Sequence, residues 1–356
     1  MTKAKKKNRL RRLHLVIKQN IKDLDRPHWS GLKSRVEKID QGYINLDRNE
    51  NQDTVLTEHI RNAVKHYIDL DSVTKYEDYY RYYELFADYY NTSMDNLLIT
   101  GGCDEAIRLT FEASLSSSDT FLTIAPTYRG SITNAVDLCN NIIECKEDEI
   151  DILYNLGMHN PNVFYICSPN NPTGRVYSAS FLEEILQNYP DTMMFIDNTY
   201  RHFCEEQYLH LCKYPNCVIG FSYSKSWGMA GARLGILQGH ADTISAITKI
   251  RPIMSVSSIT LRLAKYLHEN HYIIDKSIER NLEGIKYAHK YYSNCKIYSE
   301  PTINHIVFDP EPQHIKQLDN SLILYGKAGE FSPNAIRLTT LPKDQFEALI
   351  CSNTYK

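Results

Sequence analysis

Short apolar runs alternate with helix-like segments between residues 97 and 237, and this alternation constrains the fold more than any other feature of the chain. Each run has the length of a buried strand, and turn-forming or hydroxyl-bearing residues follow most of them. Strands that alternate with helices favour an α/β domain built on a mostly parallel central sheet. The expected strands are 97–100, 120–124, 141–145, 163–167, 193–196, 217–221 and 234–237.

Residues that can carry chemistry follow these runs directly, at the edge where an open α/β sheet places its ligand crevice. The run 217–221 leads into a loop in which Lys225 stands among serines, and Arg233 follows eight residues later. A single lysine on such a loop is suited to condense with a carbonyl group as a Schiff-base nucleophile, and Arg233 suits a phosphate. Taken alone, the same stretch is equally compatible with a polar surface loop.

The composition is that of an ordinary globular protein and excludes several classes. Of the 356 residues, 42% are hydrophobic and 23% are charged, and the net charge is −3. This balance gives no overall attraction to nucleic acid or membranes, and no apolar run approaches the length of about 18 residues that suggests a transmembrane helix. The nine cysteines include no Cys-x-x-Cys pair, which favours reduced, mostly buried thiols in a cytoplasmic protein over disulfides or a metal site.

The ends of the chain indicate a domain division. The first 20 residues hold eight Lys or Arg and no acidic residue. Such an arm is compatible with nucleic-acid binding, membrane binding or targeting, but it lacks a clean apolar stripe and a cleavage site, so a solvated terminal helix is favoured. We expect a basic arm at 1–40, a large domain at 56–245, and a small domain formed by 41–55 together with 246–356.

Five motifs then occur in the order found in one enzyme family. With them, the chain resembles fold-type I pyridoxal-phosphate (PLP) enzymes of the class I/II aminotransferases, and most of all the histidinol-phosphate aminotransferase subgroup, over roughly residues 43–340. The resemblance implies helices on both faces of the sheet, a smaller α+β domain, and ping-pong transfer of an amino group from a donor such as glutamate to a small phosphorylated or carboxylate-bearing keto substrate. The motifs are Gly-Cys-Asp-Glu at 102–105, Pro-Thr-Tyr at 126–128, Asn-Asn-Pro-Thr-Gly at 170–174, Asp-x-x-Tyr at 197–200, and Ser-x-Ser-Lys with its later Arg at 222–233.

The resemblance assigns roles to the motif residues around the cofactor ring. Lys225 would bind PLP covalently and move the proton at the reacting carbon, and Asp197 would keep the pyridine nitrogen protonated. Asn171 and the catalytic Tyr200 would donate to the ring hydroxyl oxygen, Asn171 would also contact the substrate, and Tyr128 would stack on the ring. The structural alternatives are a helix N-cap for Asp197, a turn residue for Asn171 and packed aromatics for the two tyrosines.

The resemblance also assigns residues that would bind acidic groups. Arg337 would bind the substrate's acid group, with a structural ion pair as the alternative. Tyr76 would reach the cofactor phosphate of a neighbouring subunit, which implies a homodimer with shared active sites, although Glu77 stands where the family usually has proline. The cofactor phosphate itself would be bound by backbone N–H groups and side chains of Gly102, Cys103, Asp104, Ser222, Ser224 and Arg233.

Departures from the family pattern leave the substrate and reaction open. Tyr325, with Lys327 nearby, stands where the family often has an arginine that binds a substrate phosphate, and Asn-Thr replaces Glu-Ala between Asp197 and Tyr200. A decarboxylase of a phosphorylated amino acid, such as phosphoserine or phosphothreonine, would use the same lysine and aspartate. Ala-Gly at 230–231 is more typical of the aminotransferases. The intact lysine and aspartate argue against a third possibility, a PLP-binding module without catalysis.

Overall fold

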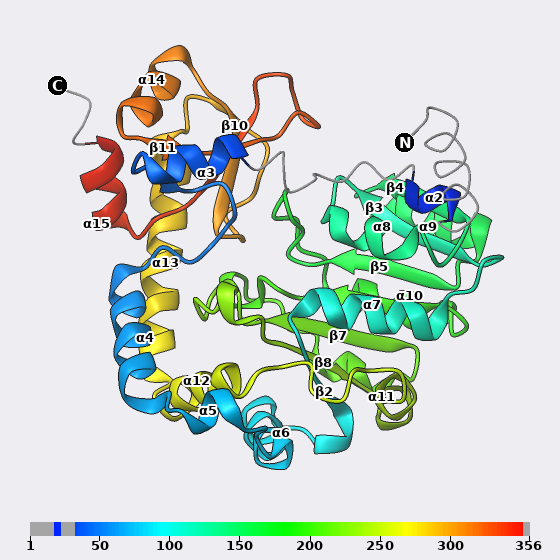
Figure 1. Ribbon diagram of the computed structural model, residues 1–356. Helices are drawn as coiled ribbons and strands as arrows, with labels where there is room; N and C mark the ends of the chain where they lie inside the picture. The colour runs from blue at the N-terminus through cyan, green and yellow to red at the C-terminus, as the bar shows by residue number, and fades with distance from the viewer. Residues whose placement is uncertain (1–17, 23–32, 352–356) are drawn as a thin grey trace, which may run out of the picture.

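The computed structural model describes residues 18–22 and 33–351 of the chain. Its centre is a seven-stranded sheet, drawn from cyan to yellow-green in Figure 1, that lies below a smaller lobe. The seven strands are β2 (Leu97–Thr100), β3 (Thr120–Ala125), β4 (Asn141–Lys146), β5 (Val163–Cys167), β6 (Met193–Asp197), β7 (Cys217–Ser222) and β8 (Gly235–Gly239).

The strands follow the order β2-β8-β7-β6-β5-β3-β4 across the sheet. Strand β8 runs antiparallel to β2 and β7, and every other pair in this sheet is parallel. Strands β2 and β5 are buried at every position, as expected for strands covered on both faces. Each of the seven predicted runs forms a strand whose ends shift by no more than two residues, so the mostly parallel α/β prediction is confirmed.

Helices cover both faces of the sheet, because each face carries its own apolar core. One face packs against α7 (Cys103–Ser114), α8 (Arg129–Ala135) and α11 (Ala241–Thr248). The other face packs against α6 (Tyr79–Tyr90), α9 (Glu149–His159), α10 (Ala179–Asn188) and α12 (Ser258–Glu269).

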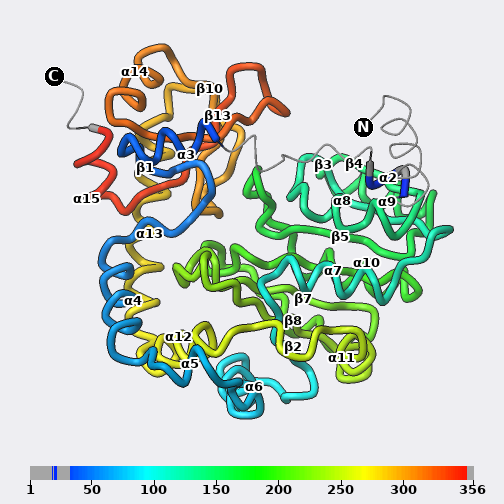
Figure 2. The backbone as a smooth tube through the Cα atoms, viewed as in Figure 1, coloured from blue at the N-terminus to red at the C-terminus, as the bar shows by residue number. Residues whose placement is uncertain are grey.

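The smaller lobe joins segments from the two ends of the chain, as the blue and red tubes in Figure 2 show. Its apolar core brings Leu46 together with Tyr292, Phe308 and Leu338. Its elements are α3 (Lys33–Asp40), β1 (Ile44–Asn45), β9 (Lys296–Ile297), β10 (His305–Asp309), α14 (Pro312–Asn320), β11 (Ile323–Leu324), β12 (Gly326–Lys327), β13 (Ile336–Thr339) and α15 (Lys343–Phe346).

Three further elements lie outside or between the two lobes. The long helix α13 (Tyr272–Tyr291) runs from α4 (Thr54–Tyr67) up into the smaller lobe, and α5 (Asp71–Thr74) lies against α12 (Figure 1). Of the predicted basic arm, the structure describes Lys18, α2 (Gln19–Lys22) and α3, and the rest lies outside the described residues. In the described part of the chain, no helix is both long enough and apolar enough to cross a membrane.

The N-terminus of α7 differs from those of several other helices, because no side chain caps it. Several helices begin at a side chain that accepts an N-terminal N–H, as Asp53 does for α4, Asp78 for α6 and Ser257 for α12. Such a cap stabilises a helix by about 1 kcal/mol. Helix α7 instead begins at Gly102, whose φ of 88° favours glycine and which supplies no side-chain cap. Its first N–H groups therefore remain available to a ligand.

Candidate active site

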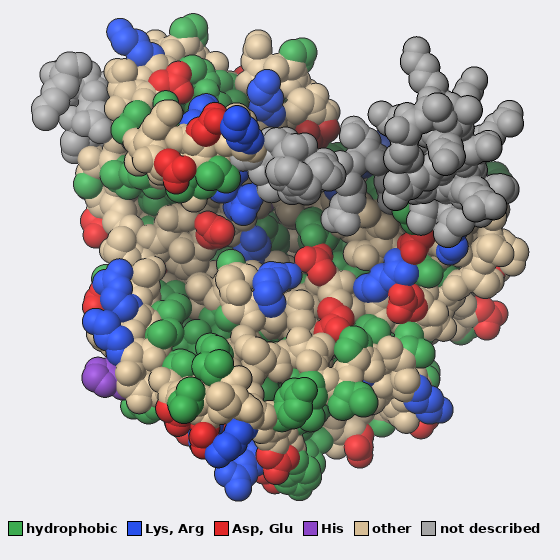
Figure 3. Space-filling model, in the orientation of Figure 1, with side chains coloured by type: hydrophobic (Ala, Val, Ile, Leu, Met, Phe, Trp, Pro, Cys, Tyr) green, Lys and Arg blue, Asp and Glu red, His purple; other side chains and the backbone are tan. Residues whose placement is uncertain are grey.

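A cavity of about 260 Å³ opens at the carboxyl edge of the central sheet. Figure 3 shows the surface hollowed between the two lobes, with Lys and Arg side chains at the hollow. The cavity brings together the ends of several strands with the first turn of α7, as expected for a ligand site in an open α/β sheet. Its lining residues are Arg48, Glu50, Cys103, Asp104, Ile107, Tyr128, Cys167, Asn171, Asp197, Thr199, Tyr200, Ser222, Ser224, Lys225, Ala230 and Arg233.

Lys225 reaches into this cavity from the loop after β7. Its Nζ donates to the backbone oxygen of Arg48 at 3.3 Å, so the side chain turns towards the segment that follows β1. Burial lowers the pKa of Lys225 to about 8, and the cations Arg337 and Arg233 act in the same direction, while Glu50 opposes them. A lysine in this environment presents a larger fraction of free amine at neutral pH than an ordinary surface lysine, which is the form that attacks a carbonyl.

Asp197 ends β6, and its carboxylate is almost fully buried at 4% exposure. Its Oδ1 accepts from the Thr199 backbone N–H at 3.1 Å, and its Oδ2 accepts from the Tyr165 hydroxyl at 2.7 Å. Burial raises the pKa of Asp197, and these hydrogen bonds oppose that shift. No α-helix begins at Asp197, because the next helical turn is the 3-10 segment Arg201–Phe203, so the N-cap alternative is not what the structure contains.

A third group of lining residues lies at the first turn of α7, around Arg233. Its Nη2 binds Asp104 Oδ2 at 3.2 Å and its Nη1 binds Ser224 Oγ at 3.3 Å. Asp104 also accepts from the Tyr128 hydroxyl at 2.6 Å. Ser222 lies in the same loop, and its Oγ accepts from the Ser224 N–H at 3.2 Å. A guanidinium, hydroxyls and free helix N–H groups are the donors that a phosphate requires.

Glycines allow β8 and Arg233 to lie close to the start of α7. A Cβ built on Gly102 would come within 2.6 Å of Arg233 Nη2, and one on Gly235 would come within 2.7 Å of the Cys103 backbone nitrogen. Both distances are shorter than real side-chain contacts, so β8 can approach the start of α7 only where side chains are missing.

The smaller lobe brings further polar groups to the cavity. Tyr200 is 2% exposed, its hydroxyl oxygen accepts from Asn49 Nδ2 at 3.2 Å, and burial raises its pKa. Arg337 lies on β13 behind the lining residues, where its Nη2 donates to the Asp47 backbone oxygen at 3.1 Å. Its Nε is buried without a hydrogen-bond partner among the described residues, and it forms no salt bridge there. The ion-pair alternative for Arg337 therefore finds no support.

Two predicted site residues need separate mention. Asn171 lines the cavity from the turn after β5, and Asp197 lines it from the end of β6. Tyr76, in contrast, does not line this chain's cavity, since it lies before α6 and is 83% exposed. Tyr76 can therefore contribute to the active site of a neighbouring subunit but not to that of its own chain.

The sequence reasoning missed several lining residues. Arg48 and Glu50 flank the buried Asn49 in the segment after β1, and no chemical motif marked them. Tyr165 was recognised only as part of a strand. Alternation along the strand puts Tyr165 on the same face as Cys167, but only the register of β5 against β6 brings this face level with Asp197.

The arrangement fits PLP in each of its parts. Lys225 offers an amine to an aldehyde, Asp197 offers a buried carboxylate to a ring nitrogen, and the start of α7 with Arg233 offers donors to a phosphate. In the described residues no group of three or more His, Cys, Asp or Glu side chains is arranged to hold a metal ion. Eight cysteines, Cys103, Cys139, Cys145, Cys167, Cys204, Cys212, Cys217 and Cys295, are free, and six of these are buried, as the sequence predicted.

Comparison with known proteins agrees with this geometry. Residues 41–295 match the family model described as aminotransferase class I and II. The chain is 30% identical to a histidinol-phosphate aminotransferase of Flavobacterium johnsoniae, an alignment that covers 71% of this chain and 70% of that protein. It is 25% identical to the histidinol-phosphate aminotransferase of Flavobacterium psychrophilum over 94% and 96% of the two chains.

A solved structure extends the similarity to the fold. The histidinol-phosphate aminotransferase of Sinorhizobium meliloti, determined in complex with pyridoxal-5'-phosphate, superposes with a TM-score of 0.79 at 18% identity and covers 95% of this chain and 96% of its own. The fold is thus that of the fold-type I enzymes. The chain belongs to the class I and II aminotransferases, and it is a PLP-dependent aminotransferase.

Proposed function

We propose that this enzyme moves an amino group from an amino acid such as glutamate to a small keto substrate that carries a phosphate or a carboxylate. The observation that carries the proposal is the placement of Lys225 and Asp197 on one cavity, with the cationic groups Arg48 and Arg337 on its smaller-lobe side. The curated relatives are histidinol-phosphate aminotransferases by name, so phosphorylated amino compounds belong among the first substrates to test.

The proposed roles follow from what each side chain contacts. When bound, PLP supplies an electron sink for the electrons released at the substrate's α-carbon. Lys225 bears the amine that binds the aldehyde carbon and then carries the proton between the two reacting carbons. Asp197 holds the proton on the ring nitrogen, because a buried carboxylate favours a cation beside it. Asn171 and Tyr200 would donate to the ring hydroxyl oxygen, and Tyr128 would stack on the ring.

Phosphate binding and substrate binding are proposed at opposite ends of the cavity. The backbone N–H groups of residues 102–104 bind the cofactor phosphate, together with Ser222, Ser224 and Arg233. Arg337 binds the substrate carboxylate, and its unpartnered Nε supports this role because a buried donor without a partner costs roughly 1–3 kcal/mol. The exposed side chain of Arg48 is placed to meet a distal phosphate or carboxylate, which would compensate for the tyrosine at 325.

Single-turnover spectroscopy tests this proposal. The PLP-loaded enzyme is mixed separately with glutamate, aspartate, histidinol phosphate, phosphoserine and phosphothreonine, and the absorbance of the bound cofactor is followed. We expect glutamate and at least one phosphorylated amine to convert the cofactor to its aminated form with release of the matching carbonyl product. Carbon dioxide release from a phosphorylated amino acid, with no keto acid formed, would instead identify a decarboxylase and overturn the proposal.

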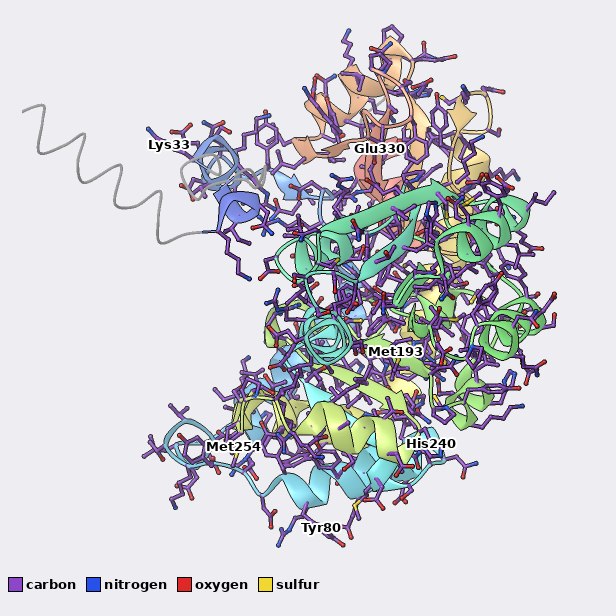
Figure 4. The ribbon with its side chains drawn as sticks, turned by 90° about the vertical axis from the view of Figure 1, so that its right-hand side faces the viewer. Lys33, Tyr80, Met193, His240, Met254 and Glu330 are labelled. Carbon is purple, nitrogen blue, oxygen red and sulfur yellow. The ribbon has the colours of Figure 1, made fainter. Side chains whose placement is uncertain are left out.

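We also propose that two copies of the chain form a homodimer with shared active sites. The segment from Leu70 to Tyr80 exposes apolar side chains to an unusual degree, with Leu70 at 75%, Val73 at 67% and Tyr76 at 83%. Figure 3 shows hydrophobic side chains on the lower edge of the molecule over α5 and α6, and Figure 4 places Tyr80 and Met254 at this edge. A second copy would cover this surface.

The segment that carries Tyr76 is fixed in place by α12. Ser258 Oγ donates to the Lys75 backbone oxygen at 2.8 Å, and Arg262 binds both Glu77 and, at 2.6 Å, Asp69. These contacts give Glu77 a structural role at the position where the family usually has proline. A fixed segment supports the proposal, because a side chain that reaches another subunit needs a defined starting point.

Replacing Tyr76 with alanine should therefore weaken PLP binding by roughly 10-fold, the cost of one hydrogen bond to a charged group. Tyr154→Ala is the matched control, because Tyr154 is also exposed, at 61%, but lies on α9. Cofactor affinity is measured by fluorescence titration, and the oligomeric state by light scattering. Mixed dimers of Tyr76→Ala and Lys225→Ala should regain part of the activity that each variant lacks. A wild-type monomer with full cofactor affinity would contradict the proposal.

We also propose a division of the chain into two domains and a cytoplasmic location. We assign residues 56–245 to a large PLP-binding domain, and 41–55 together with the C-terminal part of 246–356 to a small domain. Helix α12, which the sequence analysis placed in the small domain, packs against the core of the central sheet instead. The separate apolar cores of the sheet and of the smaller lobe support two domains. We also place the enzyme in the cytoplasm, because free, buried thiols suit a reducing compartment.

A further inference from the structure

A tyrosine from the neighbouring strand contacts Asp197 and lies outside the five motifs described above. Tyr165 lies on β5, and its hydroxyl donates to Asp197 Oδ2 at 2.7 Å. Tyr165 is 0% exposed and Asp197 is 4% exposed, so no water competes freely for this hydrogen bond. A hydrogen bond from a neutral donor to a buried carboxylate is among the stronger ones in proteins.

The Tyr165 hydroxyl has a fixed direction. In the parallel pair of β5 and β6, Cys167 is level with Asp197 and Tyr165 is level with Phe195. The Tyr165 ring stacks on Phe195 with centroids 5.8 Å apart and an angle of 18°, and the edge of Phe111 meets it at 6.3 Å and 88°. Because rings hold it on two sides, the phenol can aim its hydroxyl only along the sheet towards Asp197.

The surroundings of this pair keep Tyr165 a donor. Burial raises the pKa of Tyr165 well above its usual value, and the Asp197 carboxylate raises it further, so the hydroxyl retains its proton. Around Asp197, the buried thiols Cys103 and Cys167 also have pKa values raised by burial and remain neutral. The nearby carboxylate of Asp104 raises the pKa of Asp197 and so opposes the ionisation of Asp197. The Thr199 side chain, the Tyr165 hydroxyl and the Thr199 N–H are thus the groups that stabilise the Asp197 anion.

We infer that Tyr165 is a positioning residue, which holds the Asp197 carboxylate ionised and aimed at the pyridine nitrogen of PLP. The inference rests on the proposed placement of that nitrogen against Asp197. With both oxygens of the carboxylate held from the protein side, the group cannot rotate, and its remaining lone pairs face the cavity. Without the Tyr165 hydroxyl, Asp197 keeps only the donors of Thr199 in a buried surrounding, so its affinity for a proton of its own rises. A protonated Asp197 no longer favours a proton on the ring nitrogen.

The variant Tyr165→Phe tests this inference, because it keeps the stacked ring and removes only the hydroxyl. We expect kcat to fall roughly 10-fold, the loss of one hydrogen bond to a charged group, with KM for the amino donor unchanged. The protonation of the cofactor is read directly from the resonance of nitrogen-15-labelled PLP bound to the variant. This resonance should move towards that of an unprotonated pyridine, which a merely structural role for Tyr165 would not produce.

Tyr177→Phe is the matched control. Tyr177 is also 0% exposed, and its hydroxyl donates to the Glu147 backbone oxygen at 2.9 Å, away from the cavity lining. This variant should lose comparable thermal stability but keep the wild-type nitrogen resonance and kcat. Equal melting temperatures for the two variants would separate the electrostatic effect from any general loosening of the core.

Two results would overturn the inference, and they are distinguishable. If Tyr165→Phe keeps the wild-type nitrogen resonance and kcat while Asp197→Asn loses both, Tyr165 does not act on Asp197 and the placement of the cofactor survives. If Asp197→Asn also keeps the wild-type resonance, the ring nitrogen does not face Asp197, and the placement of the cofactor fails together with the inference.

Discussion

Replacing Lys225 with alanine should lower kcat for amino transfer by at least about 10³-fold, the largest effect that any single substitution in this enzyme is expected to have. Lys225 is the amine proposed to bind the cofactor aldehyde and to carry the proton during the reaction, so its loss removes two functions together. Its pKa of about 8, lowered mainly by burial, is the physical basis of the first function. The change is followed by steady-state kinetics and by the visible absorbance of the bound cofactor.

Two companion variants make this test specific. Lys225→Arg keeps a cation at the position but cannot supply a free amine, because a guanidinium does not lose its proton in proteins. It should be as inactive as the alanine variant. Lys249→Ala, at an exposed lysine that follows α11, should retain wild-type kcat. Covalent attachment of the cofactor in Lys225→Ala, shown by borohydride reduction and mass spectrometry, would place the reacting amine elsewhere.

Replacing Asp197 with asparagine should lower kcat by roughly 10²- to 10³-fold, the range measured when a preorganised electrostatic group is removed from an active site. Asparagine has nearly the same shape and keeps an oxygen that can accept from Tyr165 or Thr199, so the loss is one of charge. Without that charge the ring nitrogen should lose its proton, and the nitrogen-15 resonance of bound PLP reports this directly.

Asp242→Asn is the control for a lost carboxylate, because Asp242 has a side chain that is 95% exposed in the first turn of α11. Its kcat and its cofactor resonance should match those of the wild type. A melting temperature of Asp197→Asn close to that of the wild type would show that the fold persists. An Asp197→Asn enzyme with near wild-type kcat would contradict the role of this carboxylate.

The structural placement of Lys225 and Asp197 was predictable from the sequence for a local reason. Each follows an apolar run, and parallel strands in an α/β sheet end at the same edge, so residues directly after them converge. The same argument applies to Asn171 after β5 and to the glycine-led start of α7. These predictions need only the pattern of a short window and the handedness of strand connections.

Other parts of the site depend on residues that are far apart in the chain. The bond between Tyr165 and Asp197 depends on the register of β5 against β6, and the network of Asp104, Tyr128 and Arg233 joins three segments that no shared motif links. The pKa of Lys225 is lowered first by burial and then by Arg337, which the smaller lobe brings near Lys225.

The sequence by itself determined the fold class, the edge of the sheet at which the candidate site lies, and the lysine that we propose as the reacting group. Only the tertiary structure decided which polar groups meet at that edge, among them Tyr165 beside Asp197 and Arg48 and Glu50 beside Lys225. The reason is that the hydrophobic pattern of a strand indicates which of its residues are buried. The register between strands and the position of one lobe against the other follow from the packing of the whole core.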